Sequence, residues 1–290
     1  MTSSYILCRC RSGLNDCLNQ LWYVLSYAKQ TNREILFEMP CYKAADLSKI
    51  FDFSKFPVKI HTKTRPFLDQ FSGPQKNIHP IDYKSHLYLS QGPPSEPICI
   101  DRTLDIPRDV LVVHDKMGGG HNAYLVFKYL KFQPEFIKKF NERYDLPAVY
   151  DAIHVRNTDL YFDPKTFDNI VFNFIQQAGQ KPVYILSDDK NTVSTCVTKY
   201  GCRKTDTLFL EGENLHSNGS RKSQILIDAL HDLLILIQSR NLLVVPIVEH
   251  GGPPRFSGFS ILAKDLHNQK MLVKELCKIK LDKNLNFGSS

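Results

Sequence analysis

The sequence lacks any uninterrupted apolar run long enough to cross a membrane. Its richest apolar stretch, residues 225–248, is broken by Asp228, Asp232 and Arg240, whereas a membrane helix needs about 20 consecutive apolar residues. Residues 1–7 have neither the basic start nor the apolar segment of a signal peptide. We therefore expect a cytoplasmic or otherwise soluble protein without a membrane anchor of its own.

Clustered charge of one sign is also missing. Lys and Arg number 37 and Asp and Glu number 30, which gives a net charge of +7, yet no basic run exceeds two residues. A nucleic-acid groove usually needs clustered basic residues with interleaved aromatic ones. The pattern makes nucleic-acid binding the least favoured hypothesis and suits a small anionic ligand instead.

Several sequence signatures of metal sites and enzymes are absent. The eight cysteines include no Cys-x-x-Cys pair, and Cys8 and Cys10 are too close for a zinc knuckle, so we predict reduced and mostly buried thiols. Without Gly-x-x-x-x-Gly-Lys-[Ser/Thr], a P-loop NTPase is disfavoured. Without Gly-x-Ser-x-Gly, an α/β-hydrolase is disfavoured as well.

What the sequence does have is an alternation of strand and helix patterns. A strand at residues 4–10, a helix at residues 17–31 and a strand at residues 33–38 form one βαβ unit. A further helix is predicted at residues 124–144, and a second strand–helix series at residues 150–266. Such alternation implies parallel sheets with helices on both faces.

Two series of this kind predict an α/β protein with two Rossmann-like domains whose parallel sheets face a cleft. A chain of 290 residues is long enough for two small domains. We place the N-terminal domain at residues 1–147 and the C-terminal domain at residues 148–290. In open sheets of this type, ligands bind beyond the carboxyl ends of the strands.

Four polar segments are predicted at those strand ends, and the first is the turn at residues 13–16. Its Gly13 gives access to the backbone, and Asn15 supplies a neutral donor. The segment lacks the Gly-x-Gly-x-x-Gly pattern, so a dinucleotide site is weakly supported. An ordinary β–α turn would show the same residues.

The second segment, residues 154–159, leaves the predicted strand at residues 150–155. His154 and Arg156 share one face of that strand. Arg156 presents a planar fork of donors suited to a phosphate, and Asp159 could orient it or bind a sugar hydroxyl. A surface Arg paired with an Asp would give the same pattern.

The third segment ends the predicted strand at residues 182–187 with two carboxylates, Asp188 and Asp189. They could accept hydrogen bonds from a nucleobase or hold a metal. One of them could equally cap the following helix.

The fourth segment, residues 255–260, leads into a predicted helix. Hydroxyl and backbone N–H groups at a helix N-terminus form a ready anion site. The candidate residues are Ser257, Gly258, Phe259 and Ser260. A phosphate-binding Arg, a base-binding Asp and a Ser-rich helix start together outline a nucleoside-diphosphate site.

The order of these motifs resembles the GDP-fucose-dependent fucosyltransferase superfamily of GT-B fold, which holds α1,6-fucosyltransferases, nodulation fucosyltransferases and protein O-fucosyltransferases. The segments that carry the resemblance are RSGLNDCLNQL at residues 11–21, HVRNTD at residues 154–159, VYILSDD at residues 183–189 and the helix, strand and Ser-rich loop at residues 223–266. The likeness covers residues 150–266 and, more weakly, residues 5–38. Residues 41–144 show none.

The resemblance implies a role for each candidate residue. Arg156 would bind the β-phosphate and stabilise the leaving diphosphate, and His154 would lie against the nucleotide or the sugar. Asp188 or Asp189 would accept hydrogen bonds from the base, most simply guanine. The other donor-binding residues would be Asn15, approaching from the other domain, and Ser257, Gly258, Phe259 and Ser260, around the diphosphate.

The reaction that we expect is an inverting transfer of a sugar, with fucose favoured, from a nucleotide donor to a hydroxyl of an oligosaccharide or glycoprotein. The chain has no Asp-x-Asp, the metal clamp of the other large glycosyltransferase architecture, so we predict no metal and no cofactor besides the nucleotide sugar. A base must accept the acceptor's proton. We favour Asp163 over the other candidates, which are Asp159, Asp115 and His121.

Two alternatives remain open at this stage. The same fold could use UDP-xylose or another nucleotide sugar, because the phosphate site would be unchanged. The protein could also be a non-catalytic glycan-binding protein that has kept the fold. Thermal-shift screening with GDP, UDP and their sugars would separate these hypotheses, since a bound nucleotide stabilises the folded state.

Overall fold

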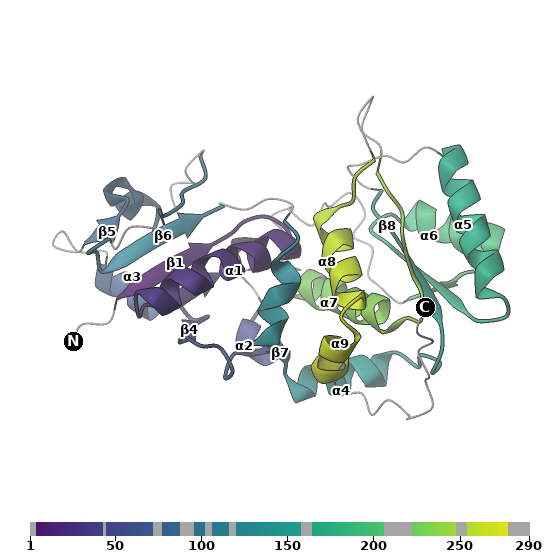
Figure 1. The fold of residues 1–290 in the computed structure, drawn as a ribbon, viewed down its shortest axis with the longest axis horizontal. Helices are drawn as coiled ribbons and strands as arrows, with labels where there is room; N and C mark the ends of the chain where they lie inside the picture. The colour runs from purple at the N-terminus through teal and green to yellow at the C-terminus, as the bar shows by residue number, and fades with distance from the viewer. Residues whose placement is uncertain are drawn as a thin grey trace. The chain divides into compact units, whose positions relative to one another are not determined.

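The chain folds into two compact α/β units. The computed structural model describes residues 4–42, 45–71, 77–87, 96–101, 106–115, 120–157, 164–205, 222–247 and 254–277. The first unit is built from residues 1–130 and 210–227, and the second from residues 131–209 and 228–290 (Figure 1). Each contains a parallel sheet, so the predicted α/β class with two Rossmann-like halves is confirmed.

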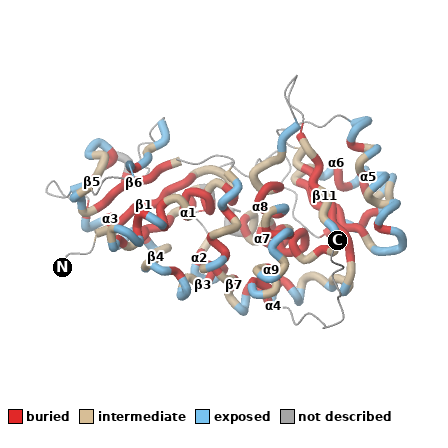
Figure 2. Tube along the Cα trace, in the orientation of Figure 1, coloured by how far each residue is buried: buried red, intermediate tan, exposed pale blue. Residues whose placement is uncertain are grey.

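The sheet of the first unit has five strands in the order β4-β2-β1-β6-β5. The bounds of these strands are β1 Tyr5–Arg9, β2 Glu34–Glu38, β4 Ile60–His61, β5 Ile78–His79 and β6 Val110–His114. All pairings among them are parallel. The five residues of β1 are all buried, as expected for a central strand covered on both faces (Figure 2).

Helix α1 connects β1 to β2 and lies along the sheet (Figure 1). It spans Leu14–Gln30, close to the predicted helix at residues 17–31, and buries the apolar side chains spaced three or four residues apart that predict it. The remaining elements of this unit are η1 Pro40–Tyr42, α2 Leu47–Ile50, β3 Phe51–Asp52, α3 Arg65–Phe71, η2 Ile81–His86 and η3 Ala123–Lys128.

The sheet of the second unit has four parallel strands in the order β10-β9-β8-β11. Its strands are β8 Asp151–Val155, β9 Val183–Ser187, β10 Arg203–Lys204 and β11 Leu242–Val244. Its other elements are β7 Lys131–Phe132, α4 Pro134–Arg143, α5 Pro164–Ala178, α6 Lys190–Tyr200, α7 Lys222–Gln238, α8 Gly258–His267 and α9 Lys270–Cys277. Helix α7 is divided between the units, and its residues from Asp228 onward belong to the second. Apolar side chains from β8, β9, α5 and α6 form one core cluster.

The prediction of a single helix at residues 124–144 is wrong. The structure has η3, the short strand β7 and then α4, which begins at Pro134. Proline disfavours helical backbone in the residue before it, and Gln133 is extended (φ −62°, ψ 140°). Proline is, however, well suited to the first turn of a new helix.

Residues 131–147, which the sequence pattern assigns to the first domain, group with the second unit. The reason is the packing of α4 on α7. The rings of Phe136 and Phe140 contact His231, and Arg143 pairs with Asp228 at 2.6 Å. The boundary between two independently folding domains, placed between residues 147 and 148, stays a prediction.

Candidate nucleotide-sugar site

The candidate site lies at the carboxyl edge of the second sheet, where the strand order reverses around β8. Strand β9 pairs with one side of β8 and β11 with the other. Such a reversal point leaves a crevice beyond the strand ends, which is where open α/β sheets bind ligands. The segment after β8 carries Arg156, the segment after β9 carries the acidic pair, and α8 begins after β11.

Arg156 is held in place by Asp188. A guanidinium nitrogen of Arg156 lies 2.6 Å from a carboxylate oxygen of Asp188, and both side chains are largely buried, at 12% and 18% exposed. The backbone N–H of Asn157 donates to the other oxygen of Asp188 at 2.8 Å. The carboxylate therefore fixes both the direction of the guanidinium and the path of the chain beside it, and the Arg–Asp pair links two strand ends.

Asp189 is the N-cap of α6. Its carboxylate accepts hydrogen bonds from the backbone N–H groups of Asn191 and Thr192 and from the Thr192 hydroxyl. The side-chain amide of Asn157 donates to it as well, at 3.1 Å. Burial alone would raise the pKa of Asp189, but the hydrogen bonds, mainly from Thr192, hold it below its ordinary value. The acceptor capacity of this carboxylate is thus used within the protein.

His154 connects the strand β8 to the start of α8. Its Nδ1 atom lies 2.8 Å from the hydroxyl of Ser260, which lies 2.8 Å from the hydroxyl of Ser257. Ser257 is the N-cap of α8 and accepts from the backbone N–H of Ser260. Burial, with the charge of Arg156 as a second cause, lowers the pKa of His154 to about 3. His154 is therefore neutral and serves as an uncharged hydrogen-bonding group.

The start of α8 has the features expected of an anion site. Gly258 is its first residue, and the ring of Phe259 packs against the ring of His154 with centroids 5.1 Å apart. The first-turn N–H groups of a helix have no partners inside the helix and carry a partial positive charge. The Ser-rich segment is thus anchored through His154 to β8, the strand that precedes Arg156.

Three other predicted residues are not among the groups described so far. Asp159 and Asp163 fall outside the residues that the structure describes, so the catalytic base stays a prediction. Asn15 belongs to the first unit, where its amide donates to the carbonyl of Gly120 at 3.2 Å. The Oδ1 atom of Asn15 is buried and has no hydrogen-bond partner among the described residues.

The alternative base Asp115 is engaged in the first unit. It accepts from the backbone N–H and the guanidinium of Arg11 and lies 3.1 Å from Nε2 of His114. Burial opposes ionisation, but the bonds from His114 and Arg11 lower its pKa to about 2. A carboxylate so acidic is a weak base at neutral pH. The other alternative, His121, is an exposed residue of the first unit, and its role as a base stays a prediction.

Two residues of the site, Asn157 and Thr192, were not predicted from the sequence. The Asn157 amide donates to Asp189 and to the hydroxyl of Thr192, at 3.1 Å and 2.9 Å. It therefore joins the end of β8 to the start of α6. The available signal was Thr192 three residues after Asp189, the spacing at which an N-cap carboxylate meets a backbone N–H.

Neither a metal cluster nor a membrane span occurs in the described parts of the chain. No group of three or more His, Cys, Asp or Glu side chains among those residues could hold a metal ion. Within the same residues, no helix is long and apolar enough to span a membrane.

Solved structures of fucosyltransferases share the architecture of this chain. A NodZ α1,6-fucosyltransferase soaked with GDP-fucose is 17% identical and covers 91% of this chain and 92% of its own, with a TM-score of 0.60. A NodZ fucosyltransferase from Bradyrhizobium is 15% identical over 91% and 92%, with a TM-score of 0.59. POFUT1 in complex with GDP is 14% identical over 92% and 95%, with a TM-score of 0.55.

The fold is that of the GT-B fucosyltransferases. The fold that the motif resemblance implies is thereby confirmed across nearly the whole chain. No protein-family profile and no curated protein matches the sequence. At identities of 14–17%, the likeness is one of fold, and what the site does has to be argued from its own residues.

Proposed function

We propose that the protein is a glycosyltransferase that moves a sugar, with fucose favoured, from a nucleoside-diphosphate donor to a hydroxyl of a glycan. One observation carries the proposal: Arg156, locked by Asp188, leaves β8 beside a neutral His154 that anchors the Ser-rich start of α8. The arrangement offers a fixed cation and a helix N-terminus to one diphosphate. The GDP and GDP-fucose held by the fold neighbours support the choice of donor.

The chemistry that follows is a direct displacement with inversion. The acceptor oxygen attacks the anomeric carbon, the bond from that carbon to the diphosphate oxygen breaks, and the diphosphate leaves with the electron pair. Arg156 and the start of α8 would stabilise the developing negative charge, which is transition-state stabilisation without a metal. A carboxylate, with Asp163 favoured and Asp159 second, would take the proton of the acceptor hydroxyl.

Base recognition is the finer part of the proposal. Asp188 is favoured over Asp189 as the residue that reads the base, because Asp189 is committed to capping α6. Asp188 already accepts from Arg156 and from Asn157, so its orientation is set before a nucleotide arrives. A carboxylate in that position would accept from N1–H and N2–H₂ of guanine.

Turnover in the presence of a chelator tests both the reaction and its independence of metal. GDP release from GDP-fucose would be measured with a mixture of glycan acceptors, with and without excess EDTA. We expect acceptor-dependent release that EDTA does not change, because Arg156 and the α8 N-terminus supply the charge stabilisation. Activity lost to EDTA and restored by Mn²⁺ would refute metal independence. Binding of GDP without turnover on any acceptor would favour a non-catalytic glycan-binding protein.

A further inference from the structure

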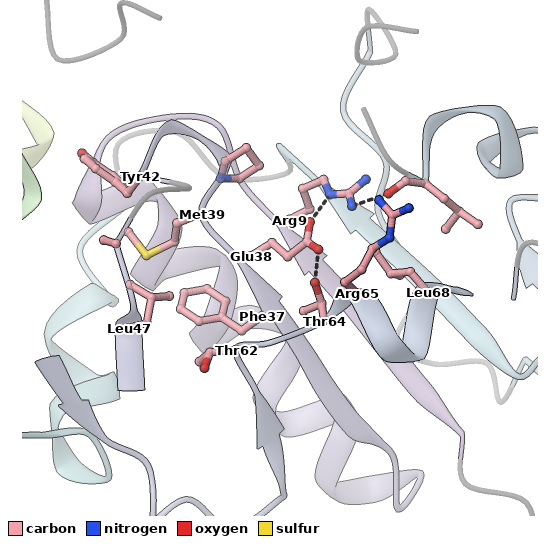
Figure 3. Close-up of a pocket in the computed structure, with 13 residues that line it drawn as sticks. Arg9, Phe37, Glu38, Met39, Tyr42, Leu47, Thr62, Thr64, Arg65 and Leu68 are labelled. Carbon is pink, nitrogen blue, oxygen red and sulfur yellow. Dashed lines mark hydrogen bonds and ion pairs between the residues drawn. The ribbon is translucent and has the colours of Figure 1, made fainter. Parts of the chain in front are cut away.

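The first unit contains a pocket of its own at the carboxyl edge of its sheet. It has a volume of about 180 Å³ and is lined by residues at or just beyond the ends of β1, β2 and β4, together with residues from α2 and α3 (Figure 3). All of its lining residues belong to the first unit. None of them is among the residues proposed to bind the donor, all of which except Asn15 belong to the second unit.

One wall of the pocket contains an ion pair between the ends of two neighbouring strands. Arg9 and Glu38 are register partners at the ends of β1 and β2, and the Arg9 Nε atom lies 2.6 Å from a carboxylate oxygen of Glu38. The other carboxylate oxygen accepts from the hydroxyl of Thr64. Figure 3 shows Arg9, Glu38, Thr64 and Arg65 together on one side of the pocket.

Further hydrogen bonds hold Arg9 rigid. It is 1% exposed, and its terminal nitrogens donate to the hydroxyl of Tyr83 at 3.0 Å and to the carbonyl of Leu87 at 2.6 Å. The Tyr83 hydroxyl in turn lies 2.6 Å from Nδ1 of His114 on β6. The guanidinium thus has its charge balanced by Glu38 and its geometry set by several separate segments of the chain.

Stability alone does not account for such a pair. Removing two charges from water costs free energy that their attraction often fails to recover, and an apolar pair of similar size is commonly at least as stable. The neighbouring positions in β1 and β2 are indeed apolar, for example Leu7, Cys8, Leu36 and Phe37. Glu38 keeps 18% of its side chain exposed. A buried, partly accessible polar pair at a strand end is the pattern of a binding site.

The opposite wall of the pocket is apolar. Phe37, Met39 and Leu47 are buried and lie together across the pocket from Arg9 in Figure 3. Leu68 of α3 adds a further buried aliphatic side chain to the lining. Binding pockets for small molecules are commonly lined in this way, with apolar walls and a few polar groups that set orientation.

The charges decide what kind of ligand fits. A bound anion would meet the Glu38 carboxylate, and a bound cation would meet the Arg9 guanidinium, so either would lie against a like charge. Arg65, at the rim, is 69% exposed and pairs with Asp69. An uncharged group with several hydroxyls avoids both repulsions, because a hydroxyl donates to a carboxylate and accepts from a guanidinium.

We propose that this pocket binds one uncharged pyranose ring of a glycan. Its hydroxyl groups would meet Glu38, Thr64 and Thr62, and the C–H face of the ring would pack on Phe37 and the aliphatic side chains. The volume of about 180 Å³ suits a single ring, since larger ligands occupy sites of roughly 300–1,000 Å³. The inference goes beyond the proposed function, because it needs neither a nucleotide nor turnover.

The test is binding of neutral glycosides to the full chain without nucleotide. Methyl glycosides of glucose, galactose, mannose and N-acetylglucosamine would be titrated singly and followed by saturation-transfer NMR. We expect at least one to bind with a dissociation constant of about 1 mM, the scale of a single small ring. The uronic acid and the 2-amino-2-deoxy counterpart of the best-binding glycoside, which add a negative and a positive charge, should bind about tenfold more weakly than that glycoside.

Two variants that fill the pocket locate the binding. Ala45→Phe and Thr62→Phe add a ring from different segments of the lining, and each should weaken the best glycoside by at least about tenfold. Lys49→Phe adds the same ring at an exposed position of α2 outside the pocket and should leave binding unchanged. GDP affinity is measured on every variant: loss of glycoside binding with normal GDP binding is the expected result.

The outcomes separate this inference from the proposed function. No binding of any of the four neutral glycosides, equal or tighter binding of the charged sugars, or binding unaffected by both pocket variants would each overturn it. Melting temperatures show whether a variant is folded, and two independent variants guard against one that is not. A wild-type protein that binds a glycoside but neither GDP nor UDP would leave the pocket assigned and refute the nucleotide site.

Discussion

Arg156 is the residue on which the proposed chemistry depends most. Asp188 holds its guanidinium so that little reorganisation is needed when a diphosphate binds. Asn157 and Thr192 reinforce the arrangement by linking β8 to α6. The site is therefore rigid at the strand ends, where the charge of the leaving group would develop.

Replacing Arg156 by Lys should remove most of the activity, because Lys keeps the charge but cannot form a bidentate fork. We expect kcat/KM with GDP-fucose to fall by more than tenfold, about 1.4 kcal/mol of transition-state stabilisation or more. Arg143→Lys is the matched control, since Arg143 forms a similar pair with Asp228 at 2.6 Å. Equal losses in both variants would indicate a general effect on the fold.

His231 is a buried, titratable residue of α7. It is 3% exposed and packs among the rings of Phe136, Phe140 and Tyr144, and neither ring nitrogen has a hydrogen-bond partner among the described residues. Burial, and after it the charge of Arg143, lowers its pKa to about 4. A histidine in the unfolded chain has a pKa of about 6.5, so between these values the unfolded chain binds the additional proton.

This residue should make the fold sensitive to acid. Stability associated with neutral His231 is present above about pH 6.5 and is lost as the pH falls toward 4, by about 2 kcal/mol at pH 5. His231→Phe removes the titrating group, so the free energy of unfolding in urea should fall less from pH 7 to pH 5 than in wild type. An identical fall in both proteins would contradict the assignment. His154 and His267 titrate in both and serve as the common background.

At the scale of elements, the two caps at the site have different roles. Asp189 starts α6 and accepts two backbone N–H groups, whereas Ser257 starts α8 and is tied through Ser260 to His154. Capping of α6 accounts for the presence of Asp189 without any ligand. The second positions a helix N-terminus beside β8 and keeps the hydroxyls together.

Because Asp189 caps α6, changing it should affect the stability of the fold but leave the choice of nucleotide unchanged. Asp189→Ala should lower the free energy of unfolding by about 1 kcal/mol, while Asp189→Ser, which can still cap, should lower it less. The preference for GDP over UDP should survive in both variants but be reduced in Asp188→Ala. Urea unfolding and nucleotide titration of the three variants would check this. Loss of base preference on changing Asp189 alone would reverse the roles of the pair.

For the whole molecule, the relative affinity for GDP and UDP shows which sugar nucleotide is the donor. A site built for the guanine edge leaves its carboxylate under-satisfied with uracil, which offers a single N–H donor, and such a deficit is worth about 1–3 kcal/mol. GDP should therefore bind roughly ten- to a hundredfold more tightly than UDP. Titration calorimetry of the wild-type chain gives the ratio directly. UDP binding as tight as GDP binding would end the fucose proposal and favour a UDP-sugar, with UDP-xylose the first candidate.

Local pattern was enough to predict several parts of the molecule. The spacing of Leu18, Leu21, Leu25 and Ala28 predicts α1 because one apolar face must be buried, and α8 and β8 follow from equally local signals. The placing of His154, Arg156 and Ser257 at strand ends or helix starts is local too. Among the cysteines whose side chains the structure describes, six of seven are buried, as free thiols usually are.

Features that depend on contacts between distant parts of the chain could not be predicted from the sequence. The pairing of Arg156 with Asp188 joins two strand ends far apart in the chain, and only the parallel register of β8 and β9 brings them together. The grouping of α4 with the second unit depends on its contacts with α7, and the pocket beside Arg9 depends on the register of β1 with β2. Helix and strand preferences act over a few residues, whereas these features are set by which strands lie side by side. The sequence therefore determined the elements and the chemistry available at their ends, and the tertiary structure decided which of those groups meet.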